Sequence, residues 1–184
     1  MAQFLEIIDA CAVLNLHASG FFESILRSRP DSCCVVEQVK NESLFIRKPS
    51  DSITGYEYEP ITLDQYFQND LLKLVKLENN TEQELFVNLA ATVDDGEAAT
   101  IAVAISHNMR VVTDDKKAVR VIKQEAPRLV CLSTLDVVKA WSEARAIEPS
   151  QIKTALENII VHANYVPNSK HHLFEWWQAR LKAI

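Results

Sequence analysis

Glycine is scarce in this chain of 184 residues, which contains only Gly20, Gly55 and Gly96. Dinucleotide-binding G-x-G-x-x-G and phosphate-binding G-x-x-x-x-G-K-[ST] sequences both need closely spaced glycines, so neither is present. No stretch reaches the roughly 18 consecutive apolar residues of a membrane span. Glu6 and Asp9 interrupt the first apolar run, which is unlike a signal peptide. We therefore expect a cytoplasmic protein with no membrane partner.

An excess of positive charge is also lacking. Lys and Arg number 19 against 25 Asp and Glu, for a formal net charge of −6. This balance argues against a nucleic-acid binder that works by overall positive charge and leaves room only for a local basic strip. No C-x-x-C pair is present, and the four cysteines lie in apolar runs, which favours small reduced core residues over metal ligands. They are Cys11, Cys33, Cys34 and Cys131.

Short apolar runs alternate with helical patterns along the first 140 residues. Strands are expected at 4–8, 33–36, 71–77, 111–112 and 129–132. Helical segments are expected between them, at 37–42, 81–91, 95–106 and 116–124. Alternation of this kind is typical of a parallel sheet with helices on both faces. The predicted class is therefore α/β, with three α/β/α layers around a central parallel sheet.

Two helix starts carry capping signals. Thr81 and Glu84 have the spacing of a capping box. Asp94 or Asp95 caps the Ala-rich helix that follows, and Asp95 is the favoured residue.

The rest of the chain divides into an insertion and a tail. The irregular sequence of residues 47–68 predicts an inserted loop or hairpin, which we expect to lie beside the functional site. Residues 134–145, 149–162 and 168–181 have apolar positions at helical spacing, and their tryptophans are interpreted as packing residues. The predicted domains are an α/β domain at 1–140 and a helical C-terminal extension at 141–184 that packs on it.

Acidic residues follow two of the predicted strands. Asp9 ends the first strand, and Asp114 and Asp115 end the strand before the last. In an open parallel sheet, ligands collect at the carboxyl ends of the strands. Glu97, in the first turn of the Ala-rich helix, is positioned to join these acids. Carboxylates this close repel one another unless a cation neutralises them, and oxygen ligands favour Mg²⁺ or Mn²⁺.

Each of these acids also has a purely structural explanation when taken alone. Asp9 can cap the turn that follows it, and Asp114 or Asp115 can cap the next helix. Glu97 can simply be a first-turn carboxylate that the helix dipole favours. The combination of all of them in order is what indicates a metal site.

Three segments resemble the acidic motifs of PIN-domain nucleases. They are Ile-Ile-Asp-Ala-Cys-Ala-Val-Leu-Asn-Leu at 7–16, Asp-Asp-Gly-Glu-Ala-Ala-Thr-Ile-Ala-Val-Ala at 94–104 and Val-Val-Thr-Asp-Asp-Lys-Lys-Ala-Val-Arg at 111–120. The resemblance covers about residues 4–140 and is closest to the prokaryotic, toxin-like branch with Gly-Glu-Ala and Asp-Asp motifs. Glu97 and Asp115 are 18 residues apart, as is typical of that family.

The family also has an acid after its second strand, in a Val-x-x-Glu pattern. Glu42 fits this pattern, and Glu37 is the rival candidate. Members often carry a hydroxyl residue shortly after the first Asp, where this chain has Ala10 and Cys11. The resemblance implies that the catalytic residues are Asp9, Glu42, Glu97 and Asp115. The metal would be bound by Asp9, Glu97, Asp115 and Asp114. Asn15 and Thr113 would support these acids.

The resemblance implies a Mg²⁺- or Mn²⁺-dependent endoribonuclease that leaves a 5′-phosphate and a 3′-hydroxyl. RNA would be held by basic residues near the last acid, namely Lys116, Lys117, Arg120 and Arg110. The family further implies the toxin of a toxin–antitoxin pair, with a small antitoxin protein as partner and a homodimer as the assembly. The alternative is a catalytically silent PIN-like module that binds other proteins.

Overall fold

A computed structural model describes residues 6–29, 32–42 and 44–182. The chain forms two compact units that interleave along the sequence. The first unit comprises Met1–Val13, Arg29–Glu42 and Leu63–Ser133, and the second comprises Leu14–Ser28, Ser43–Thr62 and Thr134–Ile184. The predicted domain division at residue 140 therefore stays a prediction.

The first unit is built on a five-stranded sheet in the order β5-β2-β1-β6-β7, and every pairing is parallel. The central strands are short runs of Ile, Val and Cys that are buried on both faces, as parallel strands covered by helices usually are. In register, Ile8 pairs with Val112, so β1 and β6 end side by side. The strands are β1 Glu6–Ile8, β2 Cys33–Val36, β5 Leu72–Val75, β6 Arg110–Val112 and β7 Cys131–Leu132.

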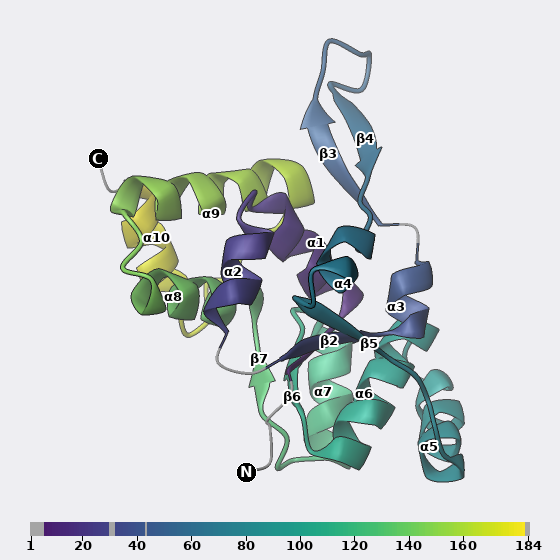
Figure 1. Cartoon of the computed structure of the whole chain (residues 1–184). Coiled ribbons are helices and arrows are strands. Elements are labelled where there is room, and N and C mark those ends of the chain that lie inside the picture. Colours follow the sequence, from purple (N-terminus) through teal and green to yellow (C-terminus); the bar gives the residue numbers. More distant parts are fainter. Residues whose placement is uncertain (1–5, 30–31, 43, 183–184) are drawn as a thin grey trace. The chain divides into compact units, whose positions relative to one another are not determined.

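Helices of the first unit flank this sheet. The Ala-rich α6 packs on β1, β2 and β6, and its small side chains permit this close approach. Helices α5 and α7 lie beside α6 (Figure 1). The helices are α3 Glu37–Asn41, α4 Asp64–Gln68, α5 Asn80–Ala90, α6 Asp95–His107 and α7 Lys116–Glu125. The parallel sheet flanked by helices confirms the predicted α/β class and is consistent with three α/β/α layers.

The caps of α5 and α6 differ from the prediction. Asn79, not Thr81, caps α5: its side chain accepts the N–H of Glu82, and Glu82 accepts the N–H of Glu78 at 2.7 Å. Asp94, not Asp95, caps α6, because Asp94 has extended backbone angles and Asp95 is already helical. Sequence spacing alone places a cap only to within a residue or two.

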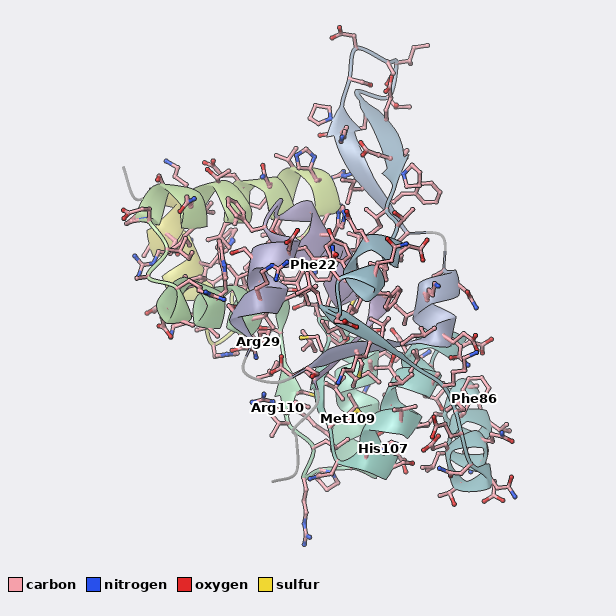
Figure 2. The ribbon with its side chains drawn as sticks, viewed as in Figure 1. Phe22, Arg29, Phe86, His107, Met109 and Arg110 are labelled. Carbon is pink, nitrogen blue, oxygen red and sulfur yellow. The ribbon has the colours of Figure 1, made fainter. Side chains whose placement is uncertain are left out.

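The start of α5 is also joined to the end of α6. His107 closes α6 and contacts the buried carboxylate of Glu82 at 2.8 Å. Figure 2 labels His107 and Phe86, which belong to these neighbouring helices. This contact helps to hold the helix whose other end carries Asp94 and Glu97.

The N-terminal connection is more helical than predicted. Helix α1 (Ala10–Ala18) begins directly after Asp9, whereas a turn followed by a short helix before Gly20 was expected. A further short helix, α2 (Phe22–Ser28), follows it and was not predicted. The 47–68 insertion is a hairpin of β3 (Phe45–Pro49) and β4 (Tyr56–Pro60), followed by α4.

The second unit contains the three predicted C-terminal helices, α8 (Thr134–Ala144), α9 (Pro149–Ala163) and α10 (Phe174–Lys182). Trp141 of α8 is buried and donates a hydrogen bond to Ser24 at 3.0 Å, which confirms its interpretation as a packing residue. Helix α10 begins later than the predicted residue 168 because the preceding residues form turns. None of the described helices is long and apolar enough to cross a bilayer.

Candidate active site

Asp9 lies immediately after β1 and is buried, with only 3% of its surface exposed. Its Oδ1 accepts the N–H of Ala10 at 2.8 Å, and its Oδ2 accepts the hydroxyl of Thr113 at 2.8 Å. Burial raises the pKa of Asp9 in spite of these hydrogen bonds, and the charge of Asp94 raises it further. The carboxyl group is therefore held in position but is costly to ionise without a cation.

Cys11 supplies a third hydrogen bond to Asp9. Its thiol donates to Oδ2 of Asp9 at 3.1 Å and accepts the N–H of Asp114 at 3.4 Å. Burial raises the pKa of this thiol, so it stays protonated and able to donate. The hydroxyl that the family pattern expects after the first Asp is thus replaced by a thiol, which sequence analysis had interpreted only as a core residue.

Glu97 lies in the first turn of α6, three residues after the capping Asp94. Asp94 accepts the N–H of Glu97 at 2.8 Å. Desolvation raises the pKa of Glu97 to about 7, with further increases from the charges of Asp94, Asp115 and Asp9. Four acids from three parts of the chain therefore lie close enough to influence one another.

Glu42 follows α3 and belongs to the same group. Desolvation raises the pKa of Glu42 to about 7, and the charges of Asp94 and Asp9 add to this effect. A Cβ atom built on Gly96 would overlap Oε1 of Glu42, so glycine at this position makes room for the carboxylate. The rival Glu37 pairs with Lys76 at 2.7 Å, which favours Glu42 as the second acid.

Asp115 combines two tasks. It caps α7, since its Oδ1 accepts the N–H groups of Lys117 and Ala118 at 2.6 and 2.8 Å. Its charge also contributes to the raised pKa of Glu97. The predicted cap and the predicted site acid are the same residue. Asp114 precedes it and is half-buried.

Asp94 is the acid that sequence reasoning missed. Among the neighbouring charges, that of Asp94 contributes most to the raised pKa of both Glu42 and Glu97. Its position directly before an Ala-rich helix marked it only as a candidate cap. A signal was nevertheless present, because a capping acid at the start of the helix that carries Glu97 must lie near Glu97.

The predicted basic residues fall into two groups. Lys116, Lys117 and Arg120 are exposed on α7, directly after Asp115. Arg110 begins β6 and pairs with the buried Glu6 at 3.0 Å. Figure 2 shows Arg110 and Arg29, which both contact Glu6. Arg110 therefore lies at the amino end of its strand, whereas the acids lie at the carboxyl ends.

The two predicted supporting residues have different partners. Thr113 donates to Asp9, as described above. Asn15 donates to the hydroxyl of Thr134 at 3.2 Å, within the second unit.

The donor set of the acidic site suits a hard cation. All of its side chains offer carboxylate oxygens, which Mg²⁺ and Mn²⁺ prefer. Within residues 6–29, 32–42 and 44–182, only Asp136, His171 and His172 bring three ligand atoms within 4.8 Å of one another. No three of the described acids come this close to one another.

Comparison with protein families gives one match. Residues 6–173 match the family DUF3368, described as a PIN domain. Searches of curated proteins and of solved structures returned no match. The family match spans well over half of the chain and agrees with the parallel sheet and with the resemblance seen in the sequence. The chain therefore belongs to the PIN-domain family, whose members are generally nucleases.

Proposed function

We propose that this protein is a metal-dependent endoribonuclease that hydrolyses RNA phosphodiester bonds. The observation that carries the proposal is the grouping of Asp9, Glu42 and Glu97, whose pKa values are all raised. Within the described part of the chain, no Lys or Arg forms an ion pair with them. Such a group of neighbouring acids is costly unless a cation or protons neutralise it.

Each acid has a role in this proposal. Asp9, Glu97 and Asp115, with Asp114 beside them, would hold Mg²⁺ or Mn²⁺ directly or through water. An ion bound there would act as a Lewis acid toward the phosphate and would lower the pKa of a water bound to it. The hydrogen bonds from Thr113 and Cys11 keep the Asp9 carboxylate oriented toward the site.

Glu42 would accept the proton of the attacking water at its carboxylate, as a general base. The new bond joins the water oxygen to phosphorus, and the bond from phosphorus to the 3′ oxygen breaks. The leaving 3′ oxygen takes a proton from solvent water, so the products are a 5′-phosphate and a 3′-hydroxyl.

The exposed Lys116, Lys117 and Arg120 of α7 are proposed to hold the RNA backbone. They follow Asp115 directly in the chain, so positive charge is available close to the acids. Phosphate contacts of this kind increase affinity without selecting a sequence. Arg110 is not used here, because it pairs with Glu6 at the other end of β6.

The deciding experiment is cleavage of a mixed RNA pool by the purified protein. Reactions would contain Mn²⁺, Mg²⁺ or EDTA, with a matched single-stranded DNA pool. We expect RNA cleavage only with metal, and loss of cleavage in the Asp9→Asn, Asp115→Asn double variant. Full cleavage by that variant would contradict the assigned site. Intact RNA with no metal bound to either protein would favour the catalytically silent interaction module.

We also propose that the protein is the toxin of a toxin–antitoxin pair and acts as a homodimer. The support is its family and its resemblance to the toxin-like branch.

Induced expression of the wild type should then arrest growth, and expression of the double variant should not. Coexpression of the neighbouring small open reading frame, as the antitoxin, should restore growth. Light scattering of the purified protein tests the dimer, and a monomer mass would contradict it.

A further inference from the structure

The second unit contains a histidine-rich cluster unrelated to the acidic site. Asp136 lies in the first turn of α8, and His171 and His172 directly precede α10. Nε2 of His172 lies 2.7 Å from Oδ1 of Asp136. The two imidazole rings stack with their centroids 4.5 Å apart. One ligand atom from each of the three residues lies within 4.8 Å of the others.

We propose that Asp136, His171 and His172 bind a divalent transition-metal ion, with Zn²⁺ as the preferred ion. Two imidazole nitrogens and one carboxylate oxygen are borderline ligands, which suit Zn²⁺ and its neighbours better than Mg²⁺. This donor set contrasts with the all-oxygen acids of the candidate active site. The two sites would therefore select different metals.

Zinc binding requires Asp136 and His172 to move slightly apart and the His171 ring to turn, because the two imidazole rings are stacked only 24° from parallel. Ligands of a tetrahedral zinc ion lie about 2.0–2.2 Å from the metal and hence about 3.3 Å from one another. The His172 nitrogen and the Asp136 oxygen already point at each other at 2.7 Å, so a small separation admits the ion in place of the shared hydrogen. Water completes the fourth position, since the side chain of His172 is 64% exposed.

One local contact competes with the metal. Nδ1 of His171 accepts the N–H of Leu173 at 3.1 Å, at the start of α10. Metal binding at His171 replaces this hydrogen bond, so the first turn of α10 adjusts when the ion binds. The site is thus coupled to the conformation of the α10 N-terminus.

The consequence of binding would be to anchor α10. No side chain of α10 in the described range 174–182 is fully buried, and the helix packs mainly against α9. A metal ion shared by Asp136 and the two histidines would link α8 directly to the start of α10. Metal binding would therefore stabilise the C-terminal helices by mass action.

The test is titration of the full chain with ZnCl₂ by isothermal calorimetry. It would use the Asp9→Asn, Asp115→Asn variant in a buffer with excess Mg²⁺, so that the acidic site does not contribute. We expect one equivalent of Zn²⁺ to bind. In this background, His171→Gln, His172→Gln and Asp136→Asn should each weaken binding at least about tenfold. Lys170→Ala is the matched control, because it changes an exposed neighbour and leaves the three ligands in place.

No binding, or binding that all three variants retain, would overturn the proposal. A second readout uses the wild-type protein and Co²⁺, whose visible absorption reports a tetrahedral site with nitrogen ligands. Its absence in excess Mg²⁺ would also overturn the proposal, even if a variant failed to fold. Neither experiment measures nuclease activity. Their outcomes are therefore independent of the test of the proposed function.

Discussion

The two ends of the five-stranded sheet both bury acidic side chains but neutralise them differently. At the amino ends, Glu6 is 1% exposed and contacts Arg29 and Arg110. At the carboxyl ends, Asp9 is 3% exposed, and its hydrogen-bond donors within the described residues are all neutral. A buried carboxylate paired with protein cations serves the fold, whereas one without such a partner is available to an external cation or a proton.

The largest effect should come from breaking the amino-end network. Glu6→Gln leaves two guanidinium groups without their carboxylate, and Arg29 is only 8% exposed. We expect a loss of about 3–5 kcal/mol in the free energy of unfolding, measured by urea denaturation. Asp9→Asn should cause no comparable loss, because the charge that it removes receives hydrogen bonds from the neutral groups of Ala10, Cys11 and Thr113.

The matched control for Glu6→Gln is Glu37→Gln, which breaks the exposed pair with Lys76. An exposed pair is worth about 1 kcal/mol or less. Equal losses in the free energy of unfolding for the two variants would show that the buried amino-end network is no more stabilising than an exposed ion pair.

The second prediction concerns Gly96. Ala at this position should displace the Glu42 carboxylate, because the new methyl group would overlap Oε1 of Glu42. We expect about a tenfold loss of nuclease activity with little change in melting temperature, since Ala favours the helix more than Gly does. In the Glu42→Gln variant, adding Gly96→Ala should cause no further loss of activity. An additional tenfold loss there would mean that Gly96 acts in another way.

A smaller effect is expected at Cys11. Cys11→Ala removes one of the donors to Asp9 but leaves Thr113 and the Ala10 N–H in place. We expect activity to fall by roughly threefold, as for one modest hydrogen bond. Cys11→Ser keeps a donor and should retain more activity than Cys11→Ala. Identical activities for Cys11→Ala and Cys11→Ser would contradict the proposal that the Cys11 side chain positions Asp9.

The smallest effect is the pH dependence of stability in metal-free protein. The pKa values of Glu42 and Glu97 are about 7 in the folded chain, above the ordinary value of 4.5. Between about pH 4.5 and 7 the folded state therefore binds more protons than the unfolded state, and stability falls as pH rises through this window. Solvent around the exposed Glu42 screens the effect.

The measurement is the melting temperature in EDTA at several pH values. Glu42→Gln combined with Glu97→Gln should flatten the decline between pH 5 and pH 8. Glu84→Gln, at an exposed position of α5, is the control and should leave it unchanged. A decline that persists in the double variant would place its origin elsewhere in the molecule.

Much of the fold could be predicted because burial leaves local patterns. The apolar runs that became β1, β2 and β6 and the Ala-rich run that became α6 were recognisable without coordinates. Helix α2 was missed, since its seven residues are too few for a clear period. The cap of α6 moved from Asp95 to Asp94 because adjacent acids both fit the pattern and only backbone angles distinguish them.

The candidate site was predictable to a smaller extent. Residues that follow a strand or open a helix, such as Asp9, Glu97 and Asp115, could be named from sequence. Arg110 was expected near the acids because it is close to Asp115 in the chain. It lies instead at the amino end of β6, since three strand residues separate the two ends.

The sequence by itself determined the order of strands and helices and placed acidic residues after the strands, because these features depend on neighbours along the chain. The tertiary structure alone decided that Asp94 joins the site, that the Cys11 thiol donates to Asp9 and that Gly96 makes room for Glu42. It also decided that Asp136 meets His171 and His172. These relations join residues whose proximity depends on strand order, helix packing and side-chain direction, which no local pattern records.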